Sequence, residues 1–134
     1  MKNITLTVII FITCISCYGQ NLIGYKGKEI EEYMKENRQD MNSANVVNEK
    51  FSYLKYSDNE DTQTLLFYLD QDSVCNGVKM ICDLSVRAAK VKEFNSIYKP
   101  NGENSWIDTH DDKAYQVVIK DEKWSCVITI EPNK

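Results

Sequence analysis

Two consecutive stretches near the end of the chain decide the fold, KAYQVVIK (113–120) and KWSCVITI (123–130). Apolar side chains occupy every second position of both stretches: Tyr115, Val117, Ile119, Trp124, Cys126, Ile128 and Ile130. This period of two is typical of strands with one buried face. The polar tip 120–123 (KDEK) fits a hairpin turn between them. The chain is therefore predicted to build an antiparallel sheet with one apolar face.

Four more strands are expected before this hairpin. A β-rich run at 51–56 ends at the turn cluster 57–61, and the strand 64–69 is apolar on both faces, which suits a central position in the sheet. After a turn at 70–73 come a strand at 74–83 and, later, a short strand at 105–109. The polar stretch 38–45 is expected to be a loop. Short connections make consecutive strands antiparallel neighbours.

Two segments show helical periodicity. In 27–37 the apolar side chains Ile30, Tyr33 and Met34 share one face. The second segment is 85–98, where the apolar positions 88, 91, 94 and 98, with 84 just before it, recur at helical spacing. Ser85 is the expected N-cap of the second helix, with Lys90 pointing outward, and the stretch 100–102 (PNG) ends that helix. The predicted fold class is α+β: an antiparallel sheet of about six strands with two helices on one face, in the order αβββαβββ.

The first nineteen residues have the pattern of a bacterial export signal. A basic start with Lys2 precedes an apolar run over 4–15, which is too short to span a bilayer. Two ways of processing remain open: cleavage after Gly19, or lipidation of Cys17, which would make an outer-membrane lipoprotein. The expected organisation is a signal peptide at 1–19 and a single domain at 20–134. The expected location is the periplasm or the outside of the cell.

The charge of the remaining domain argues against some partners. Removing 1–19 leaves 115 residues and changes the net charge from −4 to −5, because Lys2 is the one charged residue of the removed segment. Nucleic-acid binding needs a concentrated basic face, and adhesion to anionic membranes needs the same. No nucleic-acid partner is expected, and a membrane is expected only if Cys17 is lipidated.

Three cysteines, Cys75, Cys82 and Cys126, remain after the signal. In an oxidising compartment two of them could pair, but the pairing stays open. Cys75 and Cys82 would lie more than about 20 Å apart on one continuous strand, so a bond between them requires the chain to reverse at 76–77. The alternatives are a bond to Cys126 across paired strands, or three buried free thiols.

The densest chemical cluster is the group Asp108, His110, Asp111 and Asp112. Carboxylates beside a histidine could hold a divalent cation, or the histidine could act as a general base. The cluster falls at an expected hairpin tip, however, where these residue types favour turn geometry. No catalytic, cofactor-binding or metal site is therefore assigned, and these four residues are kept as weak metal candidates.

Aromatic side chains gather on the expected strands, and alternation forces some of them onto the uncovered side of the sheet. Four are taken as a candidate binding face: Tyr53, Tyr56, Tyr68 and Trp106. Exposed Tyr and Trp are suited to protein contacts. The favoured hypothesis is a non-enzymatic, exported protein-binding module without a cofactor. The alternatives are a small hydrolase or metal-dependent enzyme centred on His110, and an envelope protein anchored through Cys17.

Several features resemble small exported proteins of the Bacteroidota. They are the signal 2–15 with its end at 18–20 (YGQ), the Cys75 strand, the helix end 94–98 (FNSIY) and Trp106 before the closing hairpin. This resemblance implies export and no particular activity. The order of helices and strands is also similar to β-lactamase inhibitor-like domains and outer-membrane assembly lipoproteins, although the second half repeats none of the residues of the first. That likeness concerns fold alone.

Overall fold

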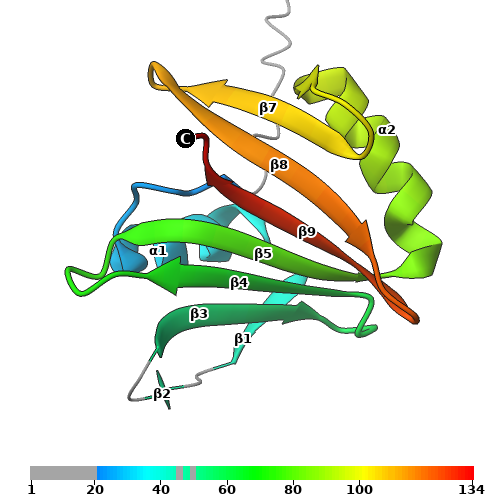
Figure 1. Cartoon of the computed structure of the whole chain (residues 1–134). Coiled ribbons are helices and arrows are strands. Elements are labelled where there is room, and N and C mark those ends of the chain that lie inside the picture. The colour runs from blue at the N-terminus through cyan, green and yellow to red at the C-terminus, as the bar shows by residue number, and fades with distance from the viewer. Residues whose placement is uncertain (1–20, 45–46, 49–50) are drawn as a thin grey trace, which may run out of the picture.

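The computed structural model describes residues 21–44, 47–48 and 51–134. In this part of the chain there are two α-helices, and nine strands form one antiparallel sheet (Figure 1). The elements are α1 (Gly27–Asn37), β1 (Met41–Ala44), β2 (Val47–Asn48), β3 (Phe51–Asp58), β4 (Gln63–Leu69), β5 (Cys75–Asp83), the 3₁₀ turn η1 (Leu84–Val86), α2 (Arg87–Ile97), β6 (Lys99–Pro100), β7 (Ser105–His110), β8 (Lys113–Asp121) and β9 (Ser125–Pro132). The expected signal peptide and Cys17 lie outside the described residues.

The sheet has two halves that meet at a single strand pair. The strand order is β1-β3-β4-β5-β9-β8-β7-β6, with β2 paired to β3 off this path. Strands β3 to β5 and β7 to β9 are neighbours in the order of the chain, as short connections require. The N-terminal half, β1 to β5, therefore joins the C-terminal half, β6 to β9, through the pairing of β5 with β9.

The predicted α+β class with two helices and an antiparallel sheet is confirmed, but the count of about six strands and the order αβββαβββ were wrong. The described chain has three more strands, all of them short: β1, β2 and β6. β1 replaces the expected loop at 38–45, because an edge strand needs few apolar residues and only Met41 of β1 is buried. β6 contains Pro100, which is tolerated where a strand pairs on one side only.

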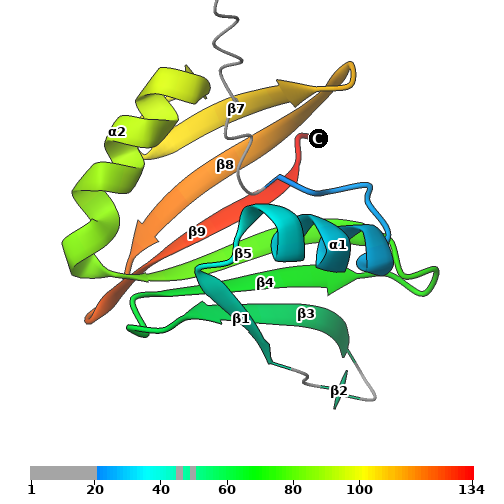
Figure 2. The same cartoon turned by 180° about the vertical axis from the view of Figure 1, so that it is seen from behind.

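One face of the sheet, called the inner face from here on, is covered by both helices (Figure 2). Residues directly opposite one another on this face form continuous rows, as with Val78, Ile130 and Val117 across β5, β9 and β8. Ile30 and Met34 of α1 and Phe94 of α2 pack into the same cluster and are almost fully buried. The alternation read from the two closing strands places this core correctly.

Helix α1 has the predicted bounds, and local contacts explain where it starts and how closely it packs. The backbone N–H of Lys26 donates to Glu29 Oε2 at 2.8 Å, which closes the first turn. Gly27 donates its N–H to the carbonyl of Ser73 at 2.9 Å, and a Cβ on this glycine would lie 3.2 Å from Leu69 Cδ1. The helix therefore sits close to the turn between β4 and β5, with Ile30 facing the core.

The buried face of helix α2 differs from the predicted one. The 3₁₀ turn η1 comes first, with the N–H of Ser85 donating to Asp83 Oδ1 at 2.9 Å, so the capping side chain is Asp83 and not Ser85. Lys90, expected to point outward, is buried, and its Nζ donates to Glu93 Oε2 at 3.2 Å. Leu84, expected on the apolar side, is 41% exposed.

Candidate functional site

The face opposite the helices, called the outer face, has neither α1 nor α2 over it (Figure 1). It carries a set of half-buried apolar side chains on five strands: Tyr53, Leu66, Tyr68, Ile107, Val118 and Val127. Tyr53 and Tyr68 are direct partners across β3 and β4, with ring centroids 6.2 Å apart. The outer face is thus a mixed surface on which aromatic and aliphatic groups are half exposed.

A group of exposed and half-buried apolar side chains lies at one end of the sheet, around the end of the strand pair β5 and β9 that joins the two halves. We call Ile81, Leu84, Trp124 and Val127 the Trp124 patch. Trp124 is 78% exposed, Leu84 is 41% exposed and Ile81 is 36% exposed. The strand register brings them to the same end, since Ile81 pairs with Val127, and Leu84 and Trp124 stand just outside the last pair of the ladder, Asp83 with Ser125.

Charges of both signs lie next to the Trp124 patch in the chain: Asp83, Asp121, Glu122, Arg87, Lys120 and Lys123. The acidic turn 58–61 (DNED) meets the same end of β5, because the N–H of Asp83 donates to the carbonyl of Thr62 at 2.8 Å. Arg87 Nε and Asp121 Oδ1 form an ion pair at 2.6 Å, and Lys123 Nζ lies 5.2 Å from the centre of the Trp124 ring. These neighbours form no concentrated basic face of the kind that attracts polyanions such as nucleic acids or anionic lipid surfaces. The distinguishing feature of the patch is its exposed apolar side chains.

Only half of the expected binding face lies on the outer face. Tyr53 and Tyr68 do, but Tyr56 and Trp106 are buried on the inner face, with 6% and 3% exposure. Trp106 packs edge-on against Phe94 of α2 at 5.3 Å. Tyr56 packs edge-on against Phe67 of β4 at 6.0 Å. Tyr56 and Trp106 were therefore wrongly placed, because both rings belong to the core beneath the helices.

Trp124 is a surface residue, contrary to what the strand pattern predicts. The alternation of 123–130 extends through Trp124 and so assigned it to the buried face. In the structure β9 begins at Ser125, because the N–H of Glu122 donates to the carbonyl of Ser125 at 2.8 Å and closes a turn before it. The polar residues 120–123 beside it were the signal that the strand alternation need not continue through this position.

The hairpin between β7 and β8 carries the four weak metal candidates. His110 Nε2 lies 3.2 Å from Asp111 Oδ2, while Asp111 and Asp112 take positive φ values of 49° and 59° as the turn residues. Asp108 is engaged elsewhere, as its Oδ2 accepts a hydrogen bond from Asn21 Nδ2 at 2.6 Å. Within the described ranges no group of three His, Cys, Asp or Glu side chains is placed to hold a metal ion.

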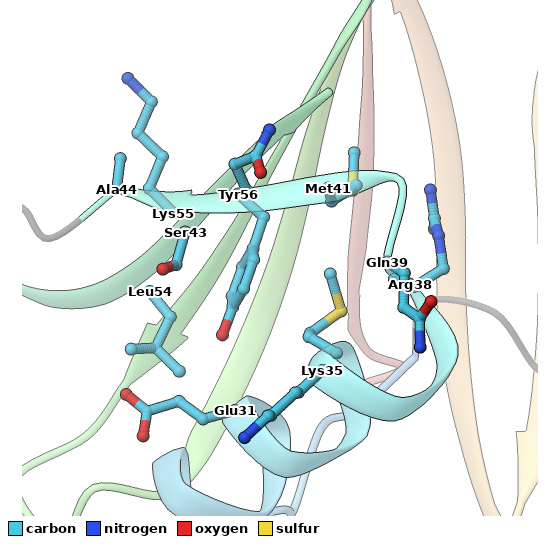
Figure 3. Close-up of a pocket in the computed structure, with 12 residues that line it drawn as sticks. Glu31, Lys35, Arg38, Gln39, Met41, Ser43, Ala44, Leu54, Lys55 and Tyr56 are labelled. Atoms are coloured by element: carbon cyan, nitrogen blue, oxygen red, sulfur yellow. The ribbon is translucent and has the colours of Figure 1, made fainter. Parts of the chain in front are cut away.

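A groove of about 490 Å³ lies between α1 and the edge formed by β1 and β3 (Figure 3). Leu54 and Tyr56 point from β3 toward Glu31 on α1. Burial, and then the nearby charge of Glu31, raise the pKa of Tyr56, so its phenol stays protonated and can act as a donor. Lys35 and Arg38 also line the groove, and this mixture of charges favours no ligand of one sign.

The three described cysteines are buried free thiols on the inner face. Cys82 of β5 and Cys126 of β9 are direct cross-strand partners, whereas Cys75 lies opposite Leu69 of β4. Burial raises the pKa of Cys75 to about 11 and that of Cys82 to about 12, and it also raises the pKa of Cys126. Such thiols are poor nucleophiles at neutral pH.

Comparisons with models of protein families, with curated protein sequences and with solved structures found no match. Of the two helices that the structure describes, neither is long and apolar enough to cross a membrane.

Proposed function

We propose that this protein is a non-enzymatic binding module that docks a protein partner on the Trp124 patch, at the end of its sheet where β5 and β9 pair, with Trp124 as the anchor. The observation that carries the proposal is the Trp124 patch, where the most exposed tryptophan of the described chain stands beside two exposed aliphatic side chains. Tryptophan is enriched among the residues that dominate binding energy at protein interfaces.

The size of the indole explains why one residue can matter this much. Burial of a large aromatic side chain removes 150–250 Å² from water, which at about 25 cal/mol per Å² corresponds to roughly 4–6 kcal/mol before the costs of association. The half-buried Val127, which pairs with Ile81, extends the apolar area onto the sheet. A protein partner with an apolar socket for the indole and a polar rim fits this surface best.

The proposal includes export, because the first nineteen residues have the pattern of a signal peptide. Mass spectrometry of the mature N-terminus separates the two processing modes. A chain that begins at Gln20 supports a released protein, and a diacylglyceryl group on Cys17 supports the lipid-anchored alternative. An N-terminus at Met1 would contradict export in either form.

Affinity capture with matched variants tests the docking surface. The domain 20–134 would be immobilised as wild type, as Trp124→Ser and as Ile97→Ser, and partners from the host's envelope extract would be quantified. Ile97 is a suitable control because it is 46% exposed and lies at the end of α2, outside the Trp124 patch. We expect a partner that is retained by wild type and Ile97→Ser and falls at least tenfold with Trp124→Ser.

Two other results would overturn the proposal. One is equal retention by wild type and Trp124→Ser. The other is Trp124-dependent binding to neutral phospholipid vesicles or to cell-wall glycans in the absence of any protein partner, since exposed tryptophans also bind those surfaces. Sedimentation of the isolated domain completes the test, because self-association through the patch would make the partner a second copy.

A further inference from the structure

The pairing of β5 with β9 is the one place where the two halves of the described sheet are hydrogen-bonded to each other. Cys82 and Cys126 lie opposite one another in this pair, next to the end of the ladder formed by Asp83 and Ser125. Both side chains are at most 1% exposed. The segment between them contains α2, β6, β7 and β8, which is most of the C-terminal half.

The register suits a disulfide without movement of the backbone. Directly opposite residues in an antiparallel pair have Cα atoms about 4.5–5.5 Å apart, and disulfides span Cα separations of about 4.4–6.8 Å. The two thiols are also close enough to act on one another, since each is among the groups that shift the pKa of the other.

Cys75 is excluded from such a bond by its position. It lies on the same continuous strand as Cys82, more than about 20 Å away at 3.3 Å per residue. The paired part of β9 ends with Ile130 opposite Val78, and the partner of Cys75 across β4 is Leu69. Its Sγ instead donates to the carbonyl of Gly77 at 3.4 Å.

We infer that Cys82 and Cys126 form a structural disulfide that links the two halves of the sheet, and that Cys75 stays a free buried thiol. The oxidant is the disulfide of a thiol–disulfide oxidoreductase or of glutathione. A thiolate of one cysteine attacks the oxidant's disulfide, and the second cysteine then displaces the oxidant's sulfur from the mixed disulfide. The protein loses two electrons and two protons, and the oxidant's disulfide becomes two thiols.

The order of events follows from burial. In the folded protein both thiols are enclosed and protonated, so an oxidant reaches them only before β5 and β9 close. The bond therefore forms during folding, in a compartment that supplies disulfide oxidants. Its formation in the cell rests on the proposed export, whereas its chemical pairing is independent of both export and partner binding.

Refolding in a mixture of reduced and oxidised glutathione tests the pairing. The denatured, reduced domain 20–134 would be refolded, its remaining thiols alkylated, and its cross-linked peptides identified by mass spectrometry. We expect one bond, between Cys82 and Cys126, and one alkylated thiol, at Cys75. In the denatured but unreduced protein, one cysteine of the three should thus react with the alkylating agent. Reduction of the bond should lower the Tm by about 10 °C, since a disulfide that closes a loop of this length contributes several kcal/mol.

Matched variants keep the test decisive. Cys75→Ser should retain both the bond and the effect of reduction on Tm, whereas Cys82→Ala and Cys126→Ala should lose both. Three free thiols in the refolded wild-type domain, or any bond that involves Cys75, would overturn the inference even if the variants failed to fold. If the bond forms in the test tube and the protein from its host still has three free thiols, the pairing stands and the proposed export fails.

Discussion

The two tryptophans of this chain have opposite surroundings, and they show how the covered face of the sheet differs from its exposed end. Trp106 is 3% exposed on the inner face, packs against Phe94 and donates its indole N–H to Asn95 Oδ1 at 2.8 Å. Trp124 is 78% exposed in the turn before β9, where Lys123 Nζ lies 5.2 Å from the centre of its ring. The indole of Trp106 is packed and hydrogen-bonded within the fold, whereas the apolar surface of Trp124 is exposed to solvent.

The same contrast extends to whole strands. On β4, Leu65 and Phe67 face the helices and are fully buried. Their neighbours Leu66 and Tyr68 face the other side and are half-buried. Two helices are enough to cover one face of a sheet of this width. The other face has apolar groups that contribute less to folding and are available for binding.

The largest expected difference is between adjacent residues of β4. Phe67→Ala should lower the free energy of unfolding by about 3–5 kcal/mol, because it removes a fully buried ring. Tyr68→Ala should cost about 1 kcal/mol or less, since its partner Tyr53 stays partly hydrated. Urea unfolding of both variants measures the difference. Equal losses would show that the outer face is as tightly packed as the inner one.

A dry inner face also predicts a loss of stability at alkaline pH. The folded-state pKa of Cys75, about 11, is above the value of about 8.5 expected for an unfolded chain. The contribution of this thiol is therefore complete below about pH 8.5 and is lost as the pH rises toward 11, by an amount of order 2 kcal/mol. Urea unfolding between pH 8 and pH 10.5 should show a shallower decline for Cys75→Ala. The same slope in both proteins would mean that water reaches this thiol.

The tryptophans give a comparison of intermediate size. Trp106→Phe should lower the free energy of unfolding by about 1–2 kcal/mol through lost packing and the lost hydrogen bond to Asn95, and Trp124→Phe should change it by about 0.5 kcal/mol or less. The protein that retains only Trp106 should have blue-shifted fluorescence that resists acrylamide. Strong quenching of that protein would place Trp106 in solvent and contradict the fold.

The smallest effect is expected at the rim of the sheet. His110→Ala should change the free energy of unfolding by less than about 0.5 kcal/mol, because its ring is 32% exposed and pairs with a turn carboxylate, Asp111, that is 82% exposed. Added Zn²⁺ should leave the Tm of wild type unchanged within about 1 °C. A metal-dependent rise that disappears in His110→Ala would instead favour the alternative of a metal-dependent enzyme.

Periodicity in the sequence predicted where the main helices and strands of the core lie. It did not predict which face of the sheet each side chain takes near the ends of the strands. The bounds of α1 follow from Gly27 and the buried pair Ile30 and Met34. Tyr53 and Tyr56 are three residues apart on one strand, so alternation places them on opposite faces, and the side that each takes is set by Leu65 and Phe67 on the next strand.

Other features depend on contacts that no local pattern contains. β1 forms because β3 offers a free edge to residues 41–44, although these residues are mostly polar. Lys90 is buried because α2 is rotated after its 3₁₀ turn, with Glu93 available to pair with its charge. The Trp124 patch exists because β9 starts one residue later than its alternation suggests, and because Leu84 follows the strand that pairs with it.

The most direct test of the docking surface is site-specific photo-cross-linking in the living host. A photoreactive phenylalanine analogue would replace Trp124 in one strain and Ile97, the equally apolar control on α2, in another. The account predicts a discrete cross-linked protein partner from position 124 that is absent from position 97 and is lost when Leu84 is also changed to serine. No partner from position 124, or the same partner from both positions, would contradict it.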